Sequence, residues 1–414
     1  MFERLRNKFK SSIRNFLILV FRRGYASLFN YLPMQYTSLY MKTLGLSEIS
    51  IGYLRSLGDA FSALTSPFLG FIADLKSLKK ALMIVMLIEL MAPIFYALAW
   101  DWKLLIPAVI CSTLTMSLTN VVEVVYIANL LRRANRATGF SFANTISTVS
   151  SLIAPMIAAI IVEISGGITK SGLKPLFLTQ LIGLLIFAPI IIIFLEDIGG
   201  RGGELNIKSE FRNMINILRG RKWLQRWIIL EALGGYVWGI TMPYIMIYAV
   251  IYKNATPIIL GLMGTALNLA SLIANMPIGK FADKIGRVKV LVAIRPLFYI
   301  SMIIFLLAPN PWFLILAWTL RGLFFASISV WQTLSMELVP ENERGRWSGI
   351  KGLISGLIRI PSATIGGYLW TFLGPESPFI IALLIDLFIR LPLIYMTPET
   401  LSKKEYFALY SEGS

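Results

Sequence analysis

The sequence predicts an all-α integral membrane protein in which twelve transmembrane helices form two pseudo-symmetric bundles of six. Three observations predict this fold: an apolar composition, apolar runs of helix length, and a repeat between the halves of the chain. Hydrophobic residues make up 56% of the 414 positions and charged residues only 15%, whereas soluble proteins carry about 25% charged residues. Apolar runs of about 20 residues cross a bilayer as helices. They do not resemble the short alternating segments of an outer-membrane barrel.

Twelve such runs follow one another along the chain. The first six are expected at residues 16–43, 48–73, 81–99, 104–131, 140–164 and 175–195. The second six are expected at residues 223–252, 258–281, 288–308, 312–339, 347–372 and 377–396. The outer loops then hold only five of the 39 basic residues, namely Lys42, Lys103, Lys170, Lys174 and Lys253. Because basic segments stay cytoplasmic, we expect a multi-pass protein of the cell (cytoplasmic) membrane with both termini in the cytoplasm.

The basic residues also account for the net charge of +17. A charge of this size can indicate nucleic-acid binding, but its placement at the ends of alternate apolar runs follows the positive-inside rule. The expected partner is therefore the lipid bilayer and no nucleic acid. The basic stretch before the first run is expected to stay attached, without cleavage of a signal peptide.

The longest polar stretch between spans divides the chain into halves. It opens with the sequence GGRGG, and Ile207, Phe211 and Leu218 then recur at helical spacing opposite Lys208 and Arg212. This pattern favours a helix lying flat at the inner membrane surface, with a solvated linker as the alternative. The expected domains are an N-terminal bundle over residues 1–197, a cytoplasmic linker over residues 198–222 and a C-terminal bundle over residues 223–414.

The two halves repeat each other. The matched pairs, all separated by 209 or 210 positions, are Gly24 with Gly234, Pro33 with Pro243, Gly52 with Gly261, Gly70 with Gly279, Asp74 with Asp283, Arg136 with Arg346 and Gly139 with Gly349. A single offset shared by this many pairs indicates two repeats. Repeats related by an axis along the membrane normal are a transporter architecture.

One repeated stretch carries a resemblance to a known family. The pattern Gly-x-x-x-Asp-(Arg/Lys)-x-Gly-(Arg/Lys)-(Arg/Lys) of the major facilitator superfamily (MFS) is matched by Gly279, Asp283, Lys284, Gly286 and Arg287. The first copy keeps Gly70, Asp74 and Lys79, but has Leu75, Ser77 and Leu78 where Arg, Gly and Arg are usual. With the helix count and the repeat, the resemblance to these secondary transporters covers essentially the whole chain.

The resemblance implies how the protein works. In the family the motif Asp lies near the N-terminus of a helix from the other half and closes an inner gate, where the helix dipole favours an anion. Asp74 and Asp283 are the expected gate residues, with Arg136 and Arg346 as nearby partners. The alternative is that these residues only set topology and a loop turn. Function as a monomer is also expected.

The resemblance places helices 1, 4, 7 and 10 around a central cavity, which explains why apolar helices carry polar side chains. The expected substrate-cavity residues are Asn30, Tyr31, Gln35, Asn120, Glu123, Tyr126, Glu231, Tyr236, Trp238, Arg321 and Gln332. Glu123 is the first candidate for proton coupling because a partly desolvated carboxyl can load and release protons near physiological pH. Asp59 and Glu231 are further candidates. Alternatively, Glu123 pairs with Arg22 or Arg23 purely for packing.

Charged residues on the other helices have a structural interpretation. Arg55 and Asp59 lie four residues apart, as do Asp386 and Arg390, so each pair can meet on one helix face. The pair Asp386 and Arg390, together with Glu89 and Arg295, is expected to be structural.

Absent motifs narrow the function. The chain has no His and no phosphate-binding Gly-x-x-x-x-Gly-Lys-Ser/Thr, so no metal, cofactor or ATP hydrolysis is expected and the protein is not expected to be an enzyme. We expect a secondary active transporter that moves a small organic solute by alternating access, coupled to protons as an antiporter. Export of amphipathic compounds is slightly favoured over uptake of a sugar or organic-anion metabolite. A non-transporting membrane sensor on the same fold is the alternative from a different class.

Overall fold

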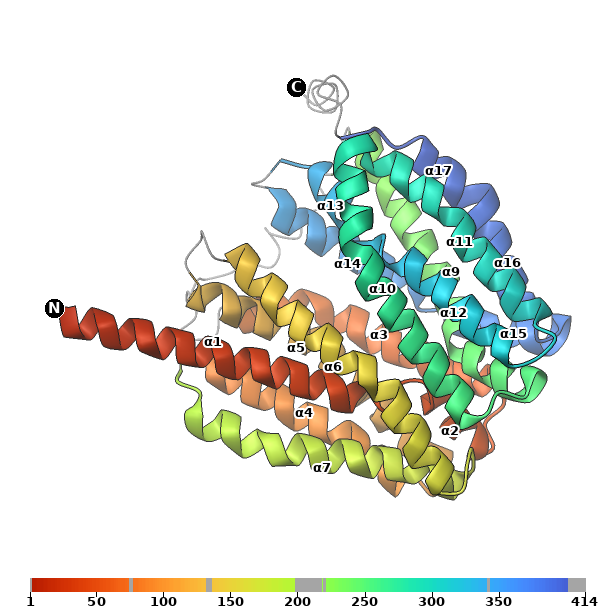
Figure 1. Cartoon of the computed structure of the whole chain (residues 1–414), viewed down its shortest axis with the longest axis horizontal. Coiled ribbons are helices and arrows are strands. Elements are labelled where there is room, and N and C mark those ends of the chain that lie inside the picture. Colours follow the sequence, from red (N-terminus) through yellow and green to blue (C-terminus); the bar gives the residue numbers. More distant parts are fainter. Residues whose placement is uncertain are drawn as a thin grey trace. The chain divides into compact units, whose positions relative to one another are not determined.

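The computed structural model describes residues 2–73, 77–131, 136–197, 218, 221–340 and 343–400, without the side chains of residues 2–11, 66–73, 120, 136 and 137. The predicted surface helix of the linker lies outside the described residues, apart from Leu218. The regular elements of the described residues are all helical (Figure 1).

The elements follow the predicted order of spans. In the first half they are α1 (Phe2–Tyr31), α2 (Thr37–Thr43), α3 (Glu48–Ala73), α4 (Leu78–Leu98), η1 (Trp102–Leu104), α5 (Leu105–Leu130), α6 (Arg136–Ile164) and α7 (Lys170–Phe194). In the second half they are α9 (Lys222–Lys253), α10 (Pro257–Ile285), α11 (Arg287–Leu307), α12 (Trp312–Phe325), α13 (Ile328–Glu337), α14 (Arg344–Arg359), α15 (Ser362–Leu373), α16 (Ser377–Ile385), η4 (Asp386–Arg390) and α17 (Leu391–Tyr395).

Each predicted span overlaps one helix or a consecutive group of helices. Within the described part of the chain, nine helical stretches are long and apolar enough to cross a membrane. The other three predicted spans correspond to α1 with α2, to α3, and to α14 with α15. The predicted all-α fold of twelve transmembrane helices is confirmed.

Several spans are broken where the sequence analysis expected one continuous helix. The first is interrupted by a turn that contains Pro33, which lacks the N–H that a helix interior needs. The tenth breaks at Ser327, whose hydroxyl donates to the carbonyl of Phe324 at 2.7 Å and so competes with the helical pattern. The eleventh breaks at Pro361, and the twelfth contains the π-helical turn η4.

The first compact unit, unit 1, comprises residues 1–45 and 64–204. Helix α1 packs against α6 and α7, and α4 packs against α5 and α7, as Figure 1 shows. Its core contains the fully buried side chains of Leu19, Leu82, Val122 and Ile191. Burial of one such side chain contributes about 1.5–3 kcal/mol in water; between lipid-embedded helices close packing acts instead.

The second compact unit, unit 2, comprises residues 46–63 and 205–414. Helix α10 packs against α11 and α12, and α9 packs against α14, α15 and α16. The first half of α3 belongs to this unit, where Ser56 bonds the Thr364 hydroxyl at 2.9 Å and Tyr53 bonds Tyr368 at 2.7 Å. This grouping describes packing, and the domain limits expected from the sequence stay a prediction.

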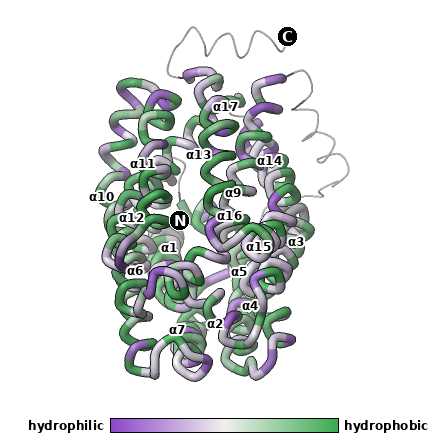
Figure 2. Tube along the Cα trace, turned by 90° about the vertical axis from the view of Figure 1, so that its right-hand side faces the viewer, coloured by the Kyte–Doolittle hydropathy of each residue, from purple (hydrophilic) through white to green (hydrophobic). Residues whose placement is uncertain are grey.

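The outward faces of the helices are apolar, as a lipid environment requires. On α7 the exposed side chains Leu178, Ile182, Leu185, Ile186 and Ile193 recur at helical spacing. Figure 2 shows the same trend along the trace, with hydrophobic residues over most helical turns and hydrophilic residues at several helix ends. Apolar residues on the outside indicate a membrane-spanning chain rather than a second buried core.

Candidate functional site

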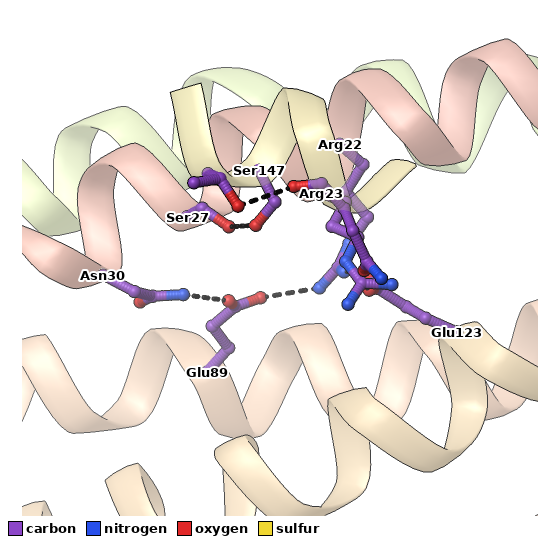
Figure 3. A network of polar contacts seen from close by, with 9 residues as sticks. Arg22, Arg23, Ser27, Asn30, Glu89, Glu123 and Ser147 are labelled. Atoms are coloured by element: carbon purple, nitrogen blue, oxygen red, sulfur yellow. Dashed lines mark hydrogen bonds and ion pairs between the residues drawn. The ribbon is translucent and has the colours of Figure 1, made fainter. Parts of the chain in front are cut away.

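A buried ion cluster lies among the helices of unit 1. Arg22 of α1 donates from Nη1 to the carboxylate of Glu123 on α5 and from Nη2 to Glu89 on α4 at 2.8 Å (Figure 3). All three side chains are at most 5% exposed. One guanidinium therefore joins three helices through two carboxylates.

Polar side chains extend this cluster. Asn30 donates from Nδ2 to Glu89 at 2.7 Å, on the side of the carboxylate opposite Arg22 (Figure 3). Gln180 of α7 donates in turn to Oδ1 of Asn30 at 2.9 Å. Four helices thus contribute to one hydrogen-bonded network, which explains how these polar groups are accommodated within apolar helices.

The charges in the cluster do not balance on their own. Arg22 carries one positive charge, whereas Glu89 and Glu123 carry two negative charges when both are ionised. Arg23 lies further away, with Nε 3.9 Å from Glu123, and its side chain is 21% exposed. The two buried carboxylates thus share one buried guanidinium, with the partly exposed Arg23 as the second cation beside them.

The other predicted cavity residues of unit 1 do not join this network. Tyr126 is buried in the core, and its hydroxyl donates to the backbone carbonyl of Glu196. Tyr31 is the last residue of α1 and is 39% exposed. Gln35 lies in the turn before α2, and the Asn120 side chain lies outside the described residues.

Unit 2 contains a cavity of about 380 Å³ between α9, α11, α12, α13 and η4. Its charged lining residues are Glu231, Arg295, Asp386 and Arg390, and its aromatic lining residues are Trp238, Phe298, Phe324, Phe325 and Trp331. A pocket of a few hundred Å³ with an apolar wall and a few polar groups is typical of small-molecule sites. The predicted residues Glu231 and Trp238 are therefore brought together.

The carboxylates at this cavity are paired. Asp386 accepts from Nη1 of Arg295 at 2.6 Å, and it also pairs with Arg390 in the turn η4. Glu231 accepts from the Trp331 indole at 2.7 Å and lies 3.4 Å from Nζ of Lys351. The same-helix pair of Asp386 and Arg390 is as the sequence predicted.

Arg321 of α12 lies next to the cavity wall. Its side chain is 3% exposed, and its guanidinium carbon lies 5.3 Å from the ring centre of Trp318, 5.6 Å from Phe298 and 6.0 Å from Trp238. Within the described part of the chain, no carboxylate or hydrogen-bond acceptor pairs with this guanidinium. Aromatic faces are its observed partners.

The remaining predicted residues of unit 2 lie apart from this cavity lining. Asp59 of α3 pairs with Arg359 of α14 at 2.6 Å, a cross-helix partner that sequence spacing does not reveal. Tyr236 is half-buried on α9, and Gln332 of α13 is exposed.

The second motif copy is organised around the start of α11. Gly286 has φ of +114°, and the backbone N–H groups of Arg287 and Val288 donate to the Glu399 carboxylate at 2.9 and 3.0 Å. Arg287 also pairs with Glu337 at 2.8 Å. Asp283 lies 3.6 Å from Arg287, with its side chain 72% exposed.

The other predicted gate residues are only partly described. Gly279 lies in α10 and the exposed Arg346 in α14, while Gly70 lies in α3. Asp74 and the Arg136 side chain lie outside the described residues. The gate roles therefore stay predictions.

Sequence reasoning did not identify the contacts of two carboxylates. It treated Glu89 as structural because the resemblance placed its helix in the outer scaffold, and it gave Glu399 no role. A buried Glu opposite an Arg within apolar runs was the available signal for the first. For the second, the signal was a Glu near the end of the last span that could cap a helix N-terminus.

The helices, their apolar outer faces and these buried polar sites define a multi-pass helical membrane protein of the transporter class. The chain belongs to the Major Facilitator Superfamily, whose family profile matches residues 19–256 and 251–407.

Two kinds of relative support the family. The chain is 23% identical to the multidrug resistance protein MdtG of Enterobacter lignolyticus (strain SCF1) over 368 residues, which are 86% of each protein. It is 28% identical over 111 residues to uncharacterized MFS-type transporters of Mycobacterium tuberculosis. That match spans 27% of this chain and only 16% of the mycobacterial proteins.

Solved structures share the fold. The E. coli xylose transporter XylE in an inward open conformation is similar with a TM-score of 0.70 at 16% identity, over 97% of this chain and 99% of that chain. A POT family transporter in complex with 5-aminolevulinic acid gives a TM-score of 0.73 at 15% identity, over 94% and 97%. At these identities the likeness concerns the fold alone.

Proposed function

We propose that this protein is a proton-coupled secondary transporter that moves a small amphipathic organic solute by alternating access. The observation that carries the coupling is the buried trio of Arg22, Glu89 and Glu123, with one guanidinium between two carboxylates. When one carboxylate binds a proton, the trio becomes neutral, so proton loading changes its charge by one unit inside a low-dielectric bundle.

Export of amphipathic compounds is the favoured direction. It is supported by the similarity over most of the chain to a multidrug resistance protein and by the aromatic lining of the unit 2 cavity. Uptake of a sugar or organic-anion metabolite is the competing direction. The protein acts in the cell membrane with both termini in the cytoplasm, as a monomer, and the motif residues Asp74, Asp283, Arg136 and Arg346 act at its inner gate.

The coupling is tested in proteoliposomes that contain a trapped pH-sensitive dye. Amphipathic anions, cations and neutral compounds are added one at a time, and at least one should move protons in the wild type. Glu123→Gln should abolish this proton movement while exchange of the solute without a gradient continues. Glu163→Gln, which removes an exposed carboxylate at the end of α6, is the matched control and should behave as wild type.

Two results would contradict the proposal. Full proton movement in both Glu123→Gln and Glu89→Gln would place coupling elsewhere, with Asp59 and Glu231 as the remaining candidates. A protein that melts cooperatively but exchanges no compound would indicate the non-transporting sensor.

A further inference from the structure

The charges around the unit 2 cavity do not balance. Arg295, Arg390, Lys351 and Arg321 are cationic, whereas the carboxylates among them are Glu231 and Asp386. Arg359, which lies close to the lining residue Gly235, is already balanced by Asp59. Among the described residues, two positive charges in and beside the cavity therefore have no matching carboxylate.

The unmatched positive charge lies at two positions. One is the trio in which two guanidinium groups share Asp386, where the buried Nε of Arg295 has no acceptor among the described residues. The other is Arg321, which is 3% exposed and contacts three aromatic rings. Aromatic faces attract a cation, but a guanidinium also has five N–H donors in its plane that need acceptors. A buried cation without an acceptor is costly in a membrane helix.

The wall between Arg321 and the cavity is aromatic. Trp238 and Phe298 both line the cavity and contact the Arg321 guanidinium. A ligand in the cavity thus has one guanidinium pair along the α11 and η4 side and a second cation behind the two rings. Glu231, which would repel an anion, is matched by Lys351 at 3.4 Å.

We propose that this cavity binds an organic anion with an apolar or aromatic body, whose carboxylate accepts from the guanidinium pair of Arg295 and Arg390 and compensates the charge of Arg321 behind the two rings. A volume of about 380 Å³ suits a body of one or two rings, because small-molecule sites begin at about 300 Å³. The aromatic lining contacts the body, and charge-assisted hydrogen bonds from Arg hold the head group. This deepens the proposed function by naming the charge of the solute.

The test compares three probes of one shape on purified protein in detergent. Isothermal titration calorimetry measures the affinities of phenylbutyrate, its neutral amide phenylbutyramide and the amine phenylbutylamine. Phenylbutyrate should bind at least about tenfold more tightly than the amide, a difference of about 1.4 kcal/mol, and the amine should bind most weakly. Arg321→Gln should reduce the preference for the anion severalfold and leave the affinity for the amide unchanged.

Two further variants make the result specific. Arg321→Lys keeps the charge and should retain most of the preference. Arg226→Gln removes an exposed guanidinium that stacks on Trp223 in the same unit, and it should bind all three probes as wild type does. If Arg321→Gln does not yield folded protein, the affinities of the wild type for the three probes test the proposal on their own.

The proposal is overturned if the amide or the amine binds wild type as tightly as phenylbutyrate, or if folded Arg321→Gln keeps the full preference. Calorimetry in detergent involves no gradient, so its outcome is independent of the proteoliposome test. If the protein binds the anion but moves no protons, the proton-coupling proposal fails and the anion site stands. If only cations drive proton movement, the coupling proposal stands and the anion site fails.

Discussion

The two carboxylates of the unit 1 trio depend on a single partner. Arg22 contacts both Glu89 and Glu123 while being only 2% exposed. Removing one member of a buried ion cluster costs more than the cluster contributes as a whole, because the remaining charge stays buried and unpaired. Stability should therefore depend strongly on replacing Arg22 alone, and much less on replacing all three residues by uncharged ones.

We therefore predict that Arg22→Gln lowers stability strongly, by about 3–5 kcal/mol. The combined variant Arg22→Met, Glu89→Gln, Glu123→Gln should recover most of this loss, because it leaves no buried charge. Thermal melting in detergent measures both effects. Arg23→Gln, which removes the partly exposed neighbour of Arg22, is the control and should change the melting temperature little.

The sequence predicted which residues matter in this cluster better than it predicted which residues pair with each other. The sequence named Glu123 and offered Arg22 as its partner, but it assigned Glu89 to the scaffold. Spacing along one helix identifies pairs four residues apart, such as Asp386 with Arg390. It cannot identify partners such as Asp59 with Arg359, which lie 300 positions apart in the chain and meet only when helices pack.

At the scale of elements, the start of α11 shows how the motif is stabilised. The first turn of a helix has N–H groups without partners within the helix, and the Glu399 carboxylate accepts from two of them. Glu399 follows the last span, so the end of the described chain holds the loop between α10 and α11 in place.

Glu399→Ala should therefore destabilise the first turn of α11 by about 0.5–2 kcal/mol, the range for loss of an N-terminal cap. Hydrogen exchange should show faster exchange at Arg287 and Val288, with little change in the middle of α11. Asp283→Asn removes a mostly exposed carboxylate from the last turn of α10, and equal loss of protection in that variant would argue against capping by Glu399.

The two motif glycines are expected to differ. Gly286 has φ of +114°, a backbone region that costs other residues about 1–3 kcal/mol. Gly286→Ala should therefore lower the melting temperature. Gly279 lies within α10, and apart from the adjoining residues and backbone of that helix no described atom lies within 4 Å of a Cβ placed there, so Gly279→Ala should be neutral or stabilising. A large loss of stability in Gly279→Ala would contradict this interpretation.

The spans could be predicted from the sequence, but their interruptions could not. Apolar runs alone located all twelve, because the bilayer requires length and apolarity. The break at Ser327 occurs with a local side-chain hydrogen bond, and the π-helical turn from Asp386 to Arg390 contains a carboxylate paired across helices. π-helical turns are frequent at functional sites, and this one supplies two lining residues of the cavity.

At the scale of the whole molecule, the buried charge clusters of the two units differ in their composition. In unit 1, two buried carboxylates share Arg22, and only the partly exposed Arg23, 3.9 Å from Glu123, supplies a second cation. The cavity region of unit 2 has two unmatched positive charges among the described residues. The proposed ligand is a proton for the first cluster and an organic anion for the second. Under the two proposals, both ligands reduce buried charge in the membrane, where uncompensated charge is unfavourable. Each unit would then supply one of the two binding events that coupled transport needs.

Such transport has a direction, which depends on the orientation of the chain in the membrane. The distribution of Lys and Arg predicts that the loop containing Lys103 faces outward and the loop before α4 faces the cytoplasm. Replacing the single Cys111 with Ser allows one new Cys to report each side, at Lys103→Cys or at Lys80→Cys, both of which are exposed positions. In intact cells a membrane-impermeant maleimide should label Lys103→Cys and should reach Lys80→Cys only after lysis. The opposite labelling pattern would invert the orientation, and the solute that we assign to export would then enter the cell.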